Sequence, residues 1–150
     1  MITIRKSTPM DSSRVMEIWR SSVDATHHFL AAADRRDIES EVARFLPDAP
    51  LDLAVDESGH VIGFMLLNDD HMEALFIDPD HHGLGTGRFL VREAIRRHPN
   101  LSTDVNEQNH QAIEFYEKLG FEPCGRSEVD GQGRPYPLMH LRYRGTGVAQ

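Results

Sequence analysis

The sequence predicts an α+β domain built around a mixed, mostly antiparallel sheet. The chain has 150 residues, which is enough for one domain (1–150) with a substantial core but not comfortably for two. Segments with alternating and with helical apolar spacing follow one another in the order β-α-α-β-β-β-α-β-α-β-β. Three of the strand candidates are consecutive and are joined by very short turns, which makes them antiparallel neighbours.

The first third of the chain contains one strand and two helices. Residues 2–7 alternate as a strand does, and residues 8–23 show helical spacing. The apolar side chains predicted on the buried face of this helix are Val15, Ile18, Trp19 and Val23. The apolar stripe predicted for a second helix, at about 33–46, consists of Ile38, Val42, Phe45 and Leu46. Prolines at 47 and 50 end this helix, because proline cannot continue one.

The rest of the chain alternates strands and helices. Three strands are predicted at 51–57, 60–68 and 71–79, with turns at Ser58-Gly59 and at 68–70. The later elements are helix 86–97, strand 101–106, helix 107–120, and strands 121–129 and 137–144. Gly120 is expected to end the last helix in a left-handed conformation.

Composition and charge limit the classes of function. The formal net charge is −8, whereas a nucleic-acid binder needs a basic surface, so no nucleic-acid partner is expected. No run approaches 18 apolar residues and "MITIRKSTPMD" contains no signal core, so neither a membrane partner nor secretion is expected. The single cysteine, Cys124, excludes an intramolecular disulfide, and a cytoplasmic enzyme fits these features. The nine histidines match no zinc spacing, so no metal is expected.

A glycine-rich segment, "LFIDPDHHGLGTGRFLV" (75–91), joins a strand to a helix, as phosphate-binding loops do. A Walker A loop is rejected, because the sixth position from Gly83 is Arg88 and no Gly-Lys-Ser/Thr occurs anywhere. The dinucleotide pattern GxGxxG lacks its last glycine, and a nicotinamide-dependent oxidoreductase is kept only as an alternative. The third interpretation is an acyl-CoA loop, in which the amides of 83–88 bind a diphosphate at the helix N-terminus. A plain glycine turn is the structural alternative.

A second informative segment is "DVNEQNHQAIEFYEKLGF" (104–121), in which Asn109 and Tyr116 share one face of the predicted helix. The two segments together resemble the GNAT superfamily of N-acetyltransferases. The acetyl-CoA loop pattern of that family, Arg/Gln-x-x-Gly-x-Gly/Ala, appears here as His82-Gly83-Leu84-Gly85-Thr86-Gly87. Its downstream pattern appears as Asn109, Phe115-Tyr116 and Gly120-Phe121. Further segments, such as "SVDATHHFL" (22–30) and "GRPYPLMHL" (133–141), resemble a small bacterial YjaB-like subgroup.

The resemblance implies a GNAT-type fold with helices on both faces of the sheet, and acetyl-CoA as the cosubstrate. The cofactor-binding residues that it implies are Phe76, Ile77, His82, Gly83, Leu84, Gly85, Thr86, Gly87, Arg88, Asn109 and Phe115. The backbone of 76–77 would bind the pantetheine arm, residues 83–88 the pyrophosphate, and Asn109 a point near the arm. Tyr116 is, by its matching position, the general acid that protonates the CoA thiolate. His82 replaces the usual Arg or Gln, so weaker or more pH-dependent CoA binding is expected.

The activity that the resemblance implies is direct attack of a primary amine on acetyl-CoA in a ternary complex. Two carboxylates are candidates for the base: Glu73 on strand 71–79 and Asp104 on the neighbouring strand. His27, His28 and Phe29, between the first two helices, are candidate substrate contacts. The acceptor is expected to be a small-molecule amine or a protein amine, and the chain a monomer or a homodimer. The alternative function is an acetyl-CoA-binding sensor module without turnover.

Overall fold

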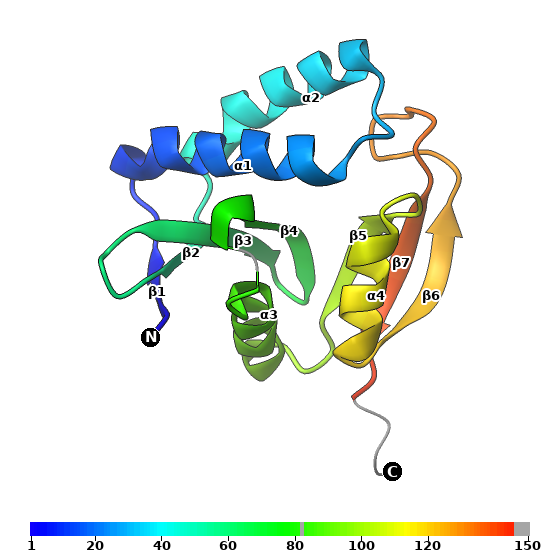
Figure 1. Ribbon diagram of the computed structural model, residues 1–150. Helices are drawn as coiled ribbons and strands as arrows, with labels where there is room; N and C mark the ends of the chain where they lie inside the picture. The colour runs from blue at the N-terminus through cyan, green and yellow to red at the C-terminus, as the bar shows by residue number, and fades with distance from the viewer. Residues whose placement is uncertain (82, 146–150) are drawn as a thin grey trace. The chain divides into compact units, whose positions relative to one another are not determined.

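The computed structural model describes residues 1–81 and 83–145, and its elements follow the predicted order (Figure 1). The strands are β1 (Thr3–Lys6), β2 (Asp52–Val55), β3 (Val61–Asn68), β4 (His71–Ile77), β5 (Ser102–Asn106), β6 (Phe121–Ser127) and β7 (Leu138–Tyr143). The helices are α1 (Ser12–Thr26), α2 (Ala32–Phe45), α3 (Thr86–Arg97) and α4 (His110–Lys118). Short 3₁₀ turns cover Pro9–Asp11, Leu46–Asp48 and Pro79–His81.

Within the described residues, seven strands form a sheet in the order β1-β2-β3-β4-β5-β7-β6. The pairs β1–β2, β2–β3, β5–β7 and β6–β7 are antiparallel, whereas β4 and β5 are parallel. The predicted mixed, mostly antiparallel sheet of an α+β fold is therefore confirmed. The parallel ladder is short, since it consists of His71↔Ser102 and Met72↔Thr103.

The chain divides into two compact units. The first unit consists of Met1–Leu66 and Ala74–Val91, and the second of Leu67–Glu73 and the chain from Arg92 onward. The single domain expected for residues 1–150 stays a prediction. Among the residues that the structure describes, no helix combines the length and the apolar character needed to cross a membrane.

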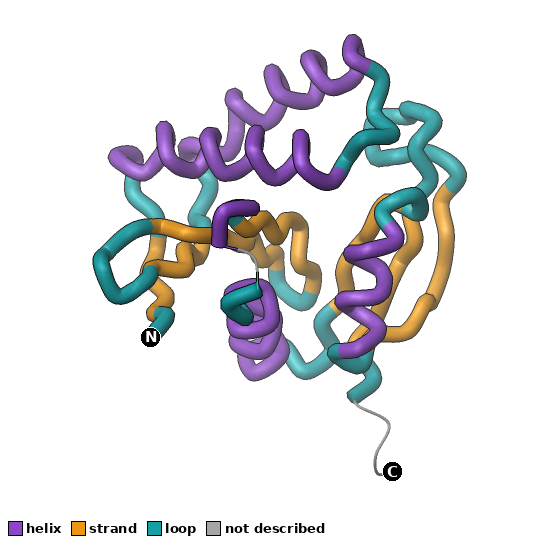
Figure 2. Tube along the Cα trace, viewed as in Figure 1, coloured by secondary structure: helices purple, strands orange, loops and turns teal. Residues whose placement is uncertain are grey.

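The core of the first unit lies between α1 and the strands β2 and β3. Its buried side chains are Val15, Met16, Ile18, Trp19, Val23, Leu46, Leu51, Leu53, Val55, Val61 and Phe64. They include all four residues predicted for the buried face of the first helix. On β3, Phe64 belongs to this core, whereas a Cβ on Gly63 would lie 3.5 Å from Thr86 Cγ2 at the start of α3. Because successive strand residues point to opposite faces, α1 and the start of α3 cover opposite faces of β3, as expected (Figure 2).

Two details of the predicted helices are wrong. Phe45 is 50% exposed instead of buried, because α2 ends there and the following 3₁₀ turn directs Leu46, which is 2% exposed, into the core. The helix predicted at 107–120 begins only at His110. The reason is that the Asn109 side chain caps the helix: its Oδ1 accepts a hydrogen bond from the Ala112 backbone N–H at 3.2 Å.

In the second unit, α4 packs against the strands through aromatic rings. Tyr116 on α4, Phe121 on β6 and Tyr143 on β7 form edge-to-face contacts, with ring centroids 5.2 and 5.5 Å apart. Gly120 has φ = +104°, which confirms the predicted left-handed stop. Side chains alternate along β5, so Thr103 and Val105 are buried while Asp104 between them is exposed.

A buried carboxylate in the first unit anchors the chain where β4 ends. Asp78 is 6% exposed, and its carboxylate accepts hydrogen bonds from Arg14 Nη2 at 2.6 Å and from the Asp80 backbone N–H at 3.0 Å. Arg14 Nε also donates to the Val61 carbonyl at 2.9 Å, which ties α1 to β3. Burial alone would raise the pKa of Asp78, but these hydrogen bonds and the Arg14 charge outweigh it and hold the pKa below its ordinary value.

We predict that Arg14→Met destabilises the fold by about 2–3 kcal/mol at pH 7, because it leaves a buried carboxylate without its cation. The lowered pKa means that Asp78 contributes stability above the ordinary aspartate pKa of about 4, and loses it as the pH falls. The difference from the wild type should therefore persist from pH 7 to about pH 4 and shrink at lower pH, as measured by urea unfolding. Arg20→Met is the matched control, since Arg20 lies on the same helix and pairs with Glu39 at the surface. That control should cost less than about 1 kcal/mol, and an equal cost for both variants would contradict the prediction.

Candidate active site

The glycine loop before α3 has the backbone of an anion-binding site. Gly83 and Gly85 adopt φ = +83° and +78°, which favours glycine at both positions. The Phe89 backbone N–H donates to the Gly85 carbonyl at 2.9 Å, so the amides of the preceding helical residues have no partner inside α3. Free amides at a helix N-terminus, where the helix dipole is positive, are suited to a diphosphate.

Side chains in the loop fit the same ligand. Leu84 is 62% exposed and Arg88 is also exposed, so a cation is available beside the amides. Thr86 is 2% exposed, and its buried Oγ1 has no hydrogen-bond partner among the described residues. Buried hydroxyls are rarely left unpaired, which is consistent with a polar group being bound here. His82, also predicted to contact the cofactor, lies outside the described residues.

The residues predicted for the pantetheine arm are at the end of β4 in the first unit. The Phe76 ring packs against Phe64, with centroids 5.6 Å apart. The Ile77 side chain fills the space beside Gly63, since a Cβ there would lie 2.8 Å from Ile77 Cδ1. Both side chains are therefore used in packing, and binding of the pantetheine arm by the backbone of these residues stays a prediction.

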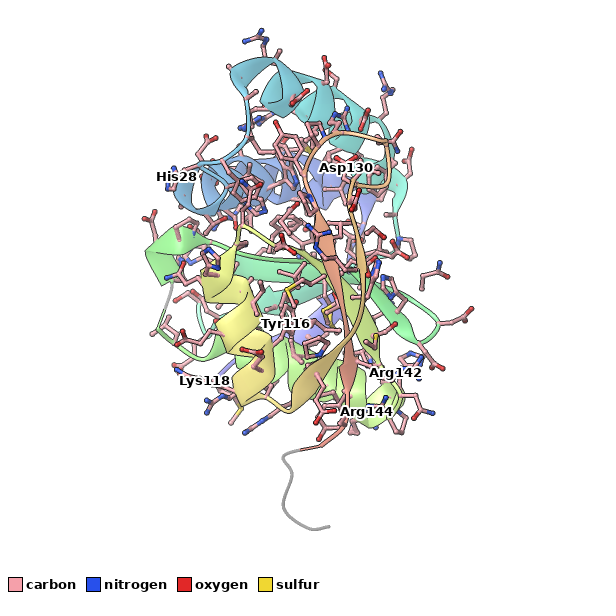
Figure 3. All side chains as sticks on the ribbon, turned by 90° about the vertical axis from the view of Figure 1, so that its right-hand side faces the viewer. His28, Tyr116, Lys118, Asp130, Arg142 and Arg144 are labelled. Atoms are coloured by element: carbon pink, nitrogen blue, oxygen red, sulfur yellow. The ribbon has the colours of Figure 1, made fainter. Side chains whose placement is uncertain are left out.

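Tyr116 lies on the side of α4 that faces the strands of the second unit (Figure 3). It is 6% exposed, and its hydroxyl donates to Met72 Sδ at 3.7 Å. Burial raises the pKa of Tyr116 above its ordinary value, and a hydrogen bond with the Thr103 side chain offsets only part of the rise. The hydroxyl therefore stays protonated at physiological pH, and Met72 Sδ is only a weak acceptor for its proton.

The other predicted cofactor residues of the second unit lie at the start and middle of α4. Asn109 is the N-cap, so its Oδ1 is occupied by Ala112 while its Nδ2 stays available as a donor. Phe115 is half-buried, and its ring lies 5.1 Å from the Tyr116 ring. Asn109 is therefore the cap of the helix in which Tyr116 is an interior residue, and their common face stays a prediction.

The candidate bases lie on the face of the sheet that points away from α4. Met72 and Thr103 contact Tyr116, and Glu73 and Asp104 are the next residues on their strands, so their side chains point to the other face. Glu73 is exposed. The Asp104 carboxylate lies between two imidazoles, 2.6 Å from His140 Nδ1 and 3.3 Å from His71 Nε2. Neither histidine was expected at the site, because no local motif connects positions so far apart in the chain.

The expected substrate contacts occupy the connection between α1 and α2. The His27 ring lies 5.3 Å from the Phe29 ring, and its Nδ1 is 2.7 Å from Thr26 Oγ1. Burial, together with the charge of the neighbouring His28, lowers the pKa of His27 to about 4, so this imidazole is neutral at physiological pH. His28 Nε2 is 2.9 Å from the Ala25 carbonyl oxygen.

The predicted residues thus divide between the two units. The first unit contains 27–29, 76–77 and 83–88, and the second contains Glu73, Asp104, Asn109, Phe115 and Tyr116. Within residues 1–81 and 83–145, no group of three or more His, Cys, Asp or Glu side chains is arranged to hold a metal ion.

Comparison with known proteins establishes the protein family to which the chain belongs. The model of the acetyltransferase (GNAT) family matches residues 12–121. The chain therefore belongs to the GNAT family, and it is an N-acetyltransferase that uses acetyl-CoA.

One similar sequence and two similar structures show how close this chain is to known acetyltransferases. The chain is 53% identical over 146 residues to the peptidyl-lysine N-acetyltransferase YjaB of Escherichia coli (strain K12), covering 97% of this chain and 99% of the relative. The solution structure of apo-form YjaB from Escherichia coli superposes with a TM-score of 0.93, over 97% of this chain and 99% of that one. The fold is shared with the PaiA N-acetyltransferase of Thermoplasma acidophilum in complex with coenzyme A. Its TM-score is 0.71 at 19% identity, over 95% of this chain and 99% of that chain.

We predict that Gly85→Ala weakens CoA binding about tenfold, because a residue with a Cβ avoids positive φ and would distort the loop amides. Calorimetric titration with CoA measures the effect. Gly59→Ala is the matched control: Gly59 also has positive φ, and neither position has any atom within 4 Å of an added Cβ. Both variants should lose similar stability, but only Gly85→Ala should bind CoA more weakly. Equal CoA affinity in the two variants would remove the loop from the binding site.

Proposed function

We propose that this acetyltransferase acetylates the ε-amine of lysine side chains in proteins. The observation that carries the proposal is the 53% identity to a relative named as a peptidyl-lysine N-acetyltransferase, over 97% of this chain. Identity over nearly the whole length includes the connections between elements, where the specificity of an enzyme usually resides. Because acetyl-CoA is made and used inside cells, we also propose that the protein is cytoplasmic. We propose that it is a monomer or a homodimer.

The reaction has three chemical requirements. The lysine ammonium, with an ordinary pKa of about 10, must lose a proton before its nitrogen can attack the thioester carbonyl. The oxyanion formed during attack needs a donor, for which a backbone N–H following the β4–β5 ladder is suited. As the C–N bond forms and the C–S bond breaks, the CoA sulfur takes up a proton and the nitrogen releases two in total.

The proposed contacts with acetyl-CoA follow from the groups that remain available. The amides of 83–88, with Arg88, hold the pyrophosphate. The backbone of Phe76 and Ile77 pairs with the pantetheine arm as an added strand would. Asn109 donates from Nδ2 near the arm, because its Oδ1 caps α4. Phe115 lies beside Tyr116 and contributes an apolar contact to the same ligand.

Tyr116 is proposed as the proton donor to the sulfur. Its hydroxyl is protonated because burial raises its pKa, and it would exchange the contact with Met72 Sδ for one with the CoA sulfur. Glu73 and Asp104 are the carboxylates proposed to assist removal of the amine proton. His27, His28 and Phe29 are proposed to contact the acceptor, and the neutral His27 can approach a cationic side chain without repulsion.

We predict that Tyr116→Phe lowers kcat about 100-fold, because general acid catalysis typically contributes a factor of that order or more. The KM for acetyl-CoA should change less than about threefold, and stability by less than about 1 kcal/mol, since the lost hydrogen bond goes to sulfur. Release of the CoA thiol measures the rate. Tyr143→Phe is the matched control, because Tyr143 belongs to the same row of rings. An undiminished kcat in Tyr116→Phe would exclude this residue as the acid.

The acceptor is tested with a polyamine and with three peptides that differ only in the lysine position and in the N-terminus. One peptide has a lysine and a blocked N-terminus, one has a free N-terminus and no lysine, and one has neither. We expect acetyl-CoA-dependent acetylation of the first peptide, at Nζ, in mass spectra. Acetylation confined to the α-amine or to the polyamine would overturn the lysine assignment. Tight acetyl-CoA binding without transfer to any amine would instead support a sensor module.

A further inference from the structure

A row of polar side chains crosses the exposed face of the second unit. His71 on β4, Asp104 on β5 and His140 on β7 form its centre, and Ser102 and Ser127 contact the outer nitrogens of the two rings. His71 Nδ1 lies 2.8 Å from Ser102 Oγ, and His140 Nε2 lies 2.7 Å from Ser127 Oγ. The side chains of His71, Asp104 and His140 are 28%, 36% and 32% exposed, so solvent and substrate can reach them.

The two arms of the row differ in geometry. His140 Nδ1 is 2.6 Å from Asp104 Oδ1, a charge-assisted hydrogen bond in which the ring N–H donates and the carboxylate accepts. His140 Nε2 then accepts from the Ser127 hydroxyl. The His140 ring fits closely over β6, because residue 125 is glycine and a Cβ there would lie only 3.2 Å from His140 Cδ2. This arm fixes the Asp104 carboxylate in place.

The arm that contains His71 is looser. His71 Nε2 lies 3.3 Å from Asp104 Oδ2, which is beyond the usual length of a charge-assisted hydrogen bond. Ser102 Oγ lies 3.5 Å from the Asp70 carbonyl oxygen, so it can donate there and accept from His71 Nδ1–H. With the proton on Nδ1, Nε2 carries the lone pair, on a ring that is 28% exposed and beside a carboxylate. Geometry of this kind is what a general base requires.

We propose that His71 Nε2 is the group that takes the proton from the acceptor amine, and that Asp104 is a positioning residue that stabilises the imidazolium formed. The proposal deepens the proposed function, on which it rests for the presence of an amine. One N–H bond of the ammonium breaks and one N–H bond forms at Nε2. The amine keeps its electron pair for attack on the thioester carbonyl. The imidazolium later returns the proton to solvent, so the enzyme is regenerated.

The location of His71 supports this role. It is the first residue of β4 and forms one of the two pairs with β5, and Glu73, two positions on, lies on the same face. Tyr116 reaches Met72 and Thr103 on the opposite face of the same ladder. The proposed base is thus the neighbour of Met72, which the proposed acid contacts. The base and the acid lie on opposite faces of the strands.

Other charged groups around His71 are few. The preceding turn contributes Asp69 and Asp70, and the Asp70 carboxylate pairs with His98 at 3.1 Å. On the same face, β4 contributes Glu73, and β7 contributes Arg142, which lies opposite Ser102. The Asp104 carboxylate forms an ion pair with His71, with Oδ2 3.3 Å from Nε2. Among these groups, its removal should therefore destabilise the charged imidazole most.

The kinetic test uses His71→Gln and Asp104→Asn with saturating acetyl-CoA and a blocked lysine peptide. We expect His71→Gln to lower kcat about 100-fold and to remove the acidic limb of the profile of kcat against pH. Asp104→Asn should shift that limb to lower pH, because the imidazolium loses its neighbouring anion. The KM for acetyl-CoA should change little in both. His98→Gln is the matched control, since His98 is 27% exposed and pairs with Asp70, and its profile should equal that of the wild type.

A second readout needs no substrate. In ¹⁵N spectra of the free protein we expect the neutral His71 ring to carry its proton on Nδ1, because Ser102 Oγ is positioned to accept it. Wild-type kcat and an unchanged profile in His71→Gln would overturn the proposal, as would a neutral His71 ring that carries its proton on Nε2. If the blocked lysine peptide is not acetylated but another amine is, the lysine assignment fails and the same variants are compared on that amine.

Discussion

The two-pair parallel ladder between β4 and β5 is the constraint on which the chemistry of the second unit depends. The pairs His71↔Ser102 and Met72↔Thr103 decide which side chains share a face. A slip of one residue would exchange the faces and expose Met72, which is 1% exposed. Thr103 secures the register further, because its hydroxyl donates to the Met72 carbonyl at 3.0 Å. Apolar burial on one face therefore fixes the position of the polar groups on the other.

The glycine loop of the first unit is anchored by buried contacts at its start, whereas its glycines are held by backbone conformation alone. Stability at its start comes from the buried Asp78 and its bonds to Arg14 and to the Asp80 backbone N–H. Gly83 and Gly85 have no atom within 4 Å of an added Cβ, so the loop conformation depends on the backbone angles and not on packing. If the loop binds the pyrophosphate as proposed, substitutions at these glycines should weaken binding without disturbing the core, whereas changes at Asp78 would disturb the buried contacts that anchor the loop.

Prediction from the sequence succeeded where the signal is local. The helical spacing of Val15, Ile18, Trp19 and Val23 identifies a buried face without knowledge of its partner, and all four are in the core. The cap at Asn109 was missed, although asparagine before a helix is a recognised start signal. The pairing of Asp104 with His71 and His140 could not be predicted, because it depends on the registers of β4, β5 and β7. Periodicity shows which face a residue takes, but it does not show which residue lies opposite on the next strand.

The separation of the proposed acid and base by the strands has a consequence for the protons. Phenolate is a stronger base than thiolate, since tyrosine has an ordinary pKa of about 10 and a thiol about 8.5, and burial widens the gap by raising the pKa of Tyr116. Full transfer to sulfur would therefore be uphill, and on the proposed mechanism Tyr116 would act first as a hydrogen-bond donor that stabilises charge on sulfur as the C–S bond breaks. On the proposed mechanism, the amine proton is held at His71 on the other face, so it cannot pass directly to Tyr116. Protons then enter and leave by separate routes through solvent, and the forward reaction does not depend on moving one proton across the sheet.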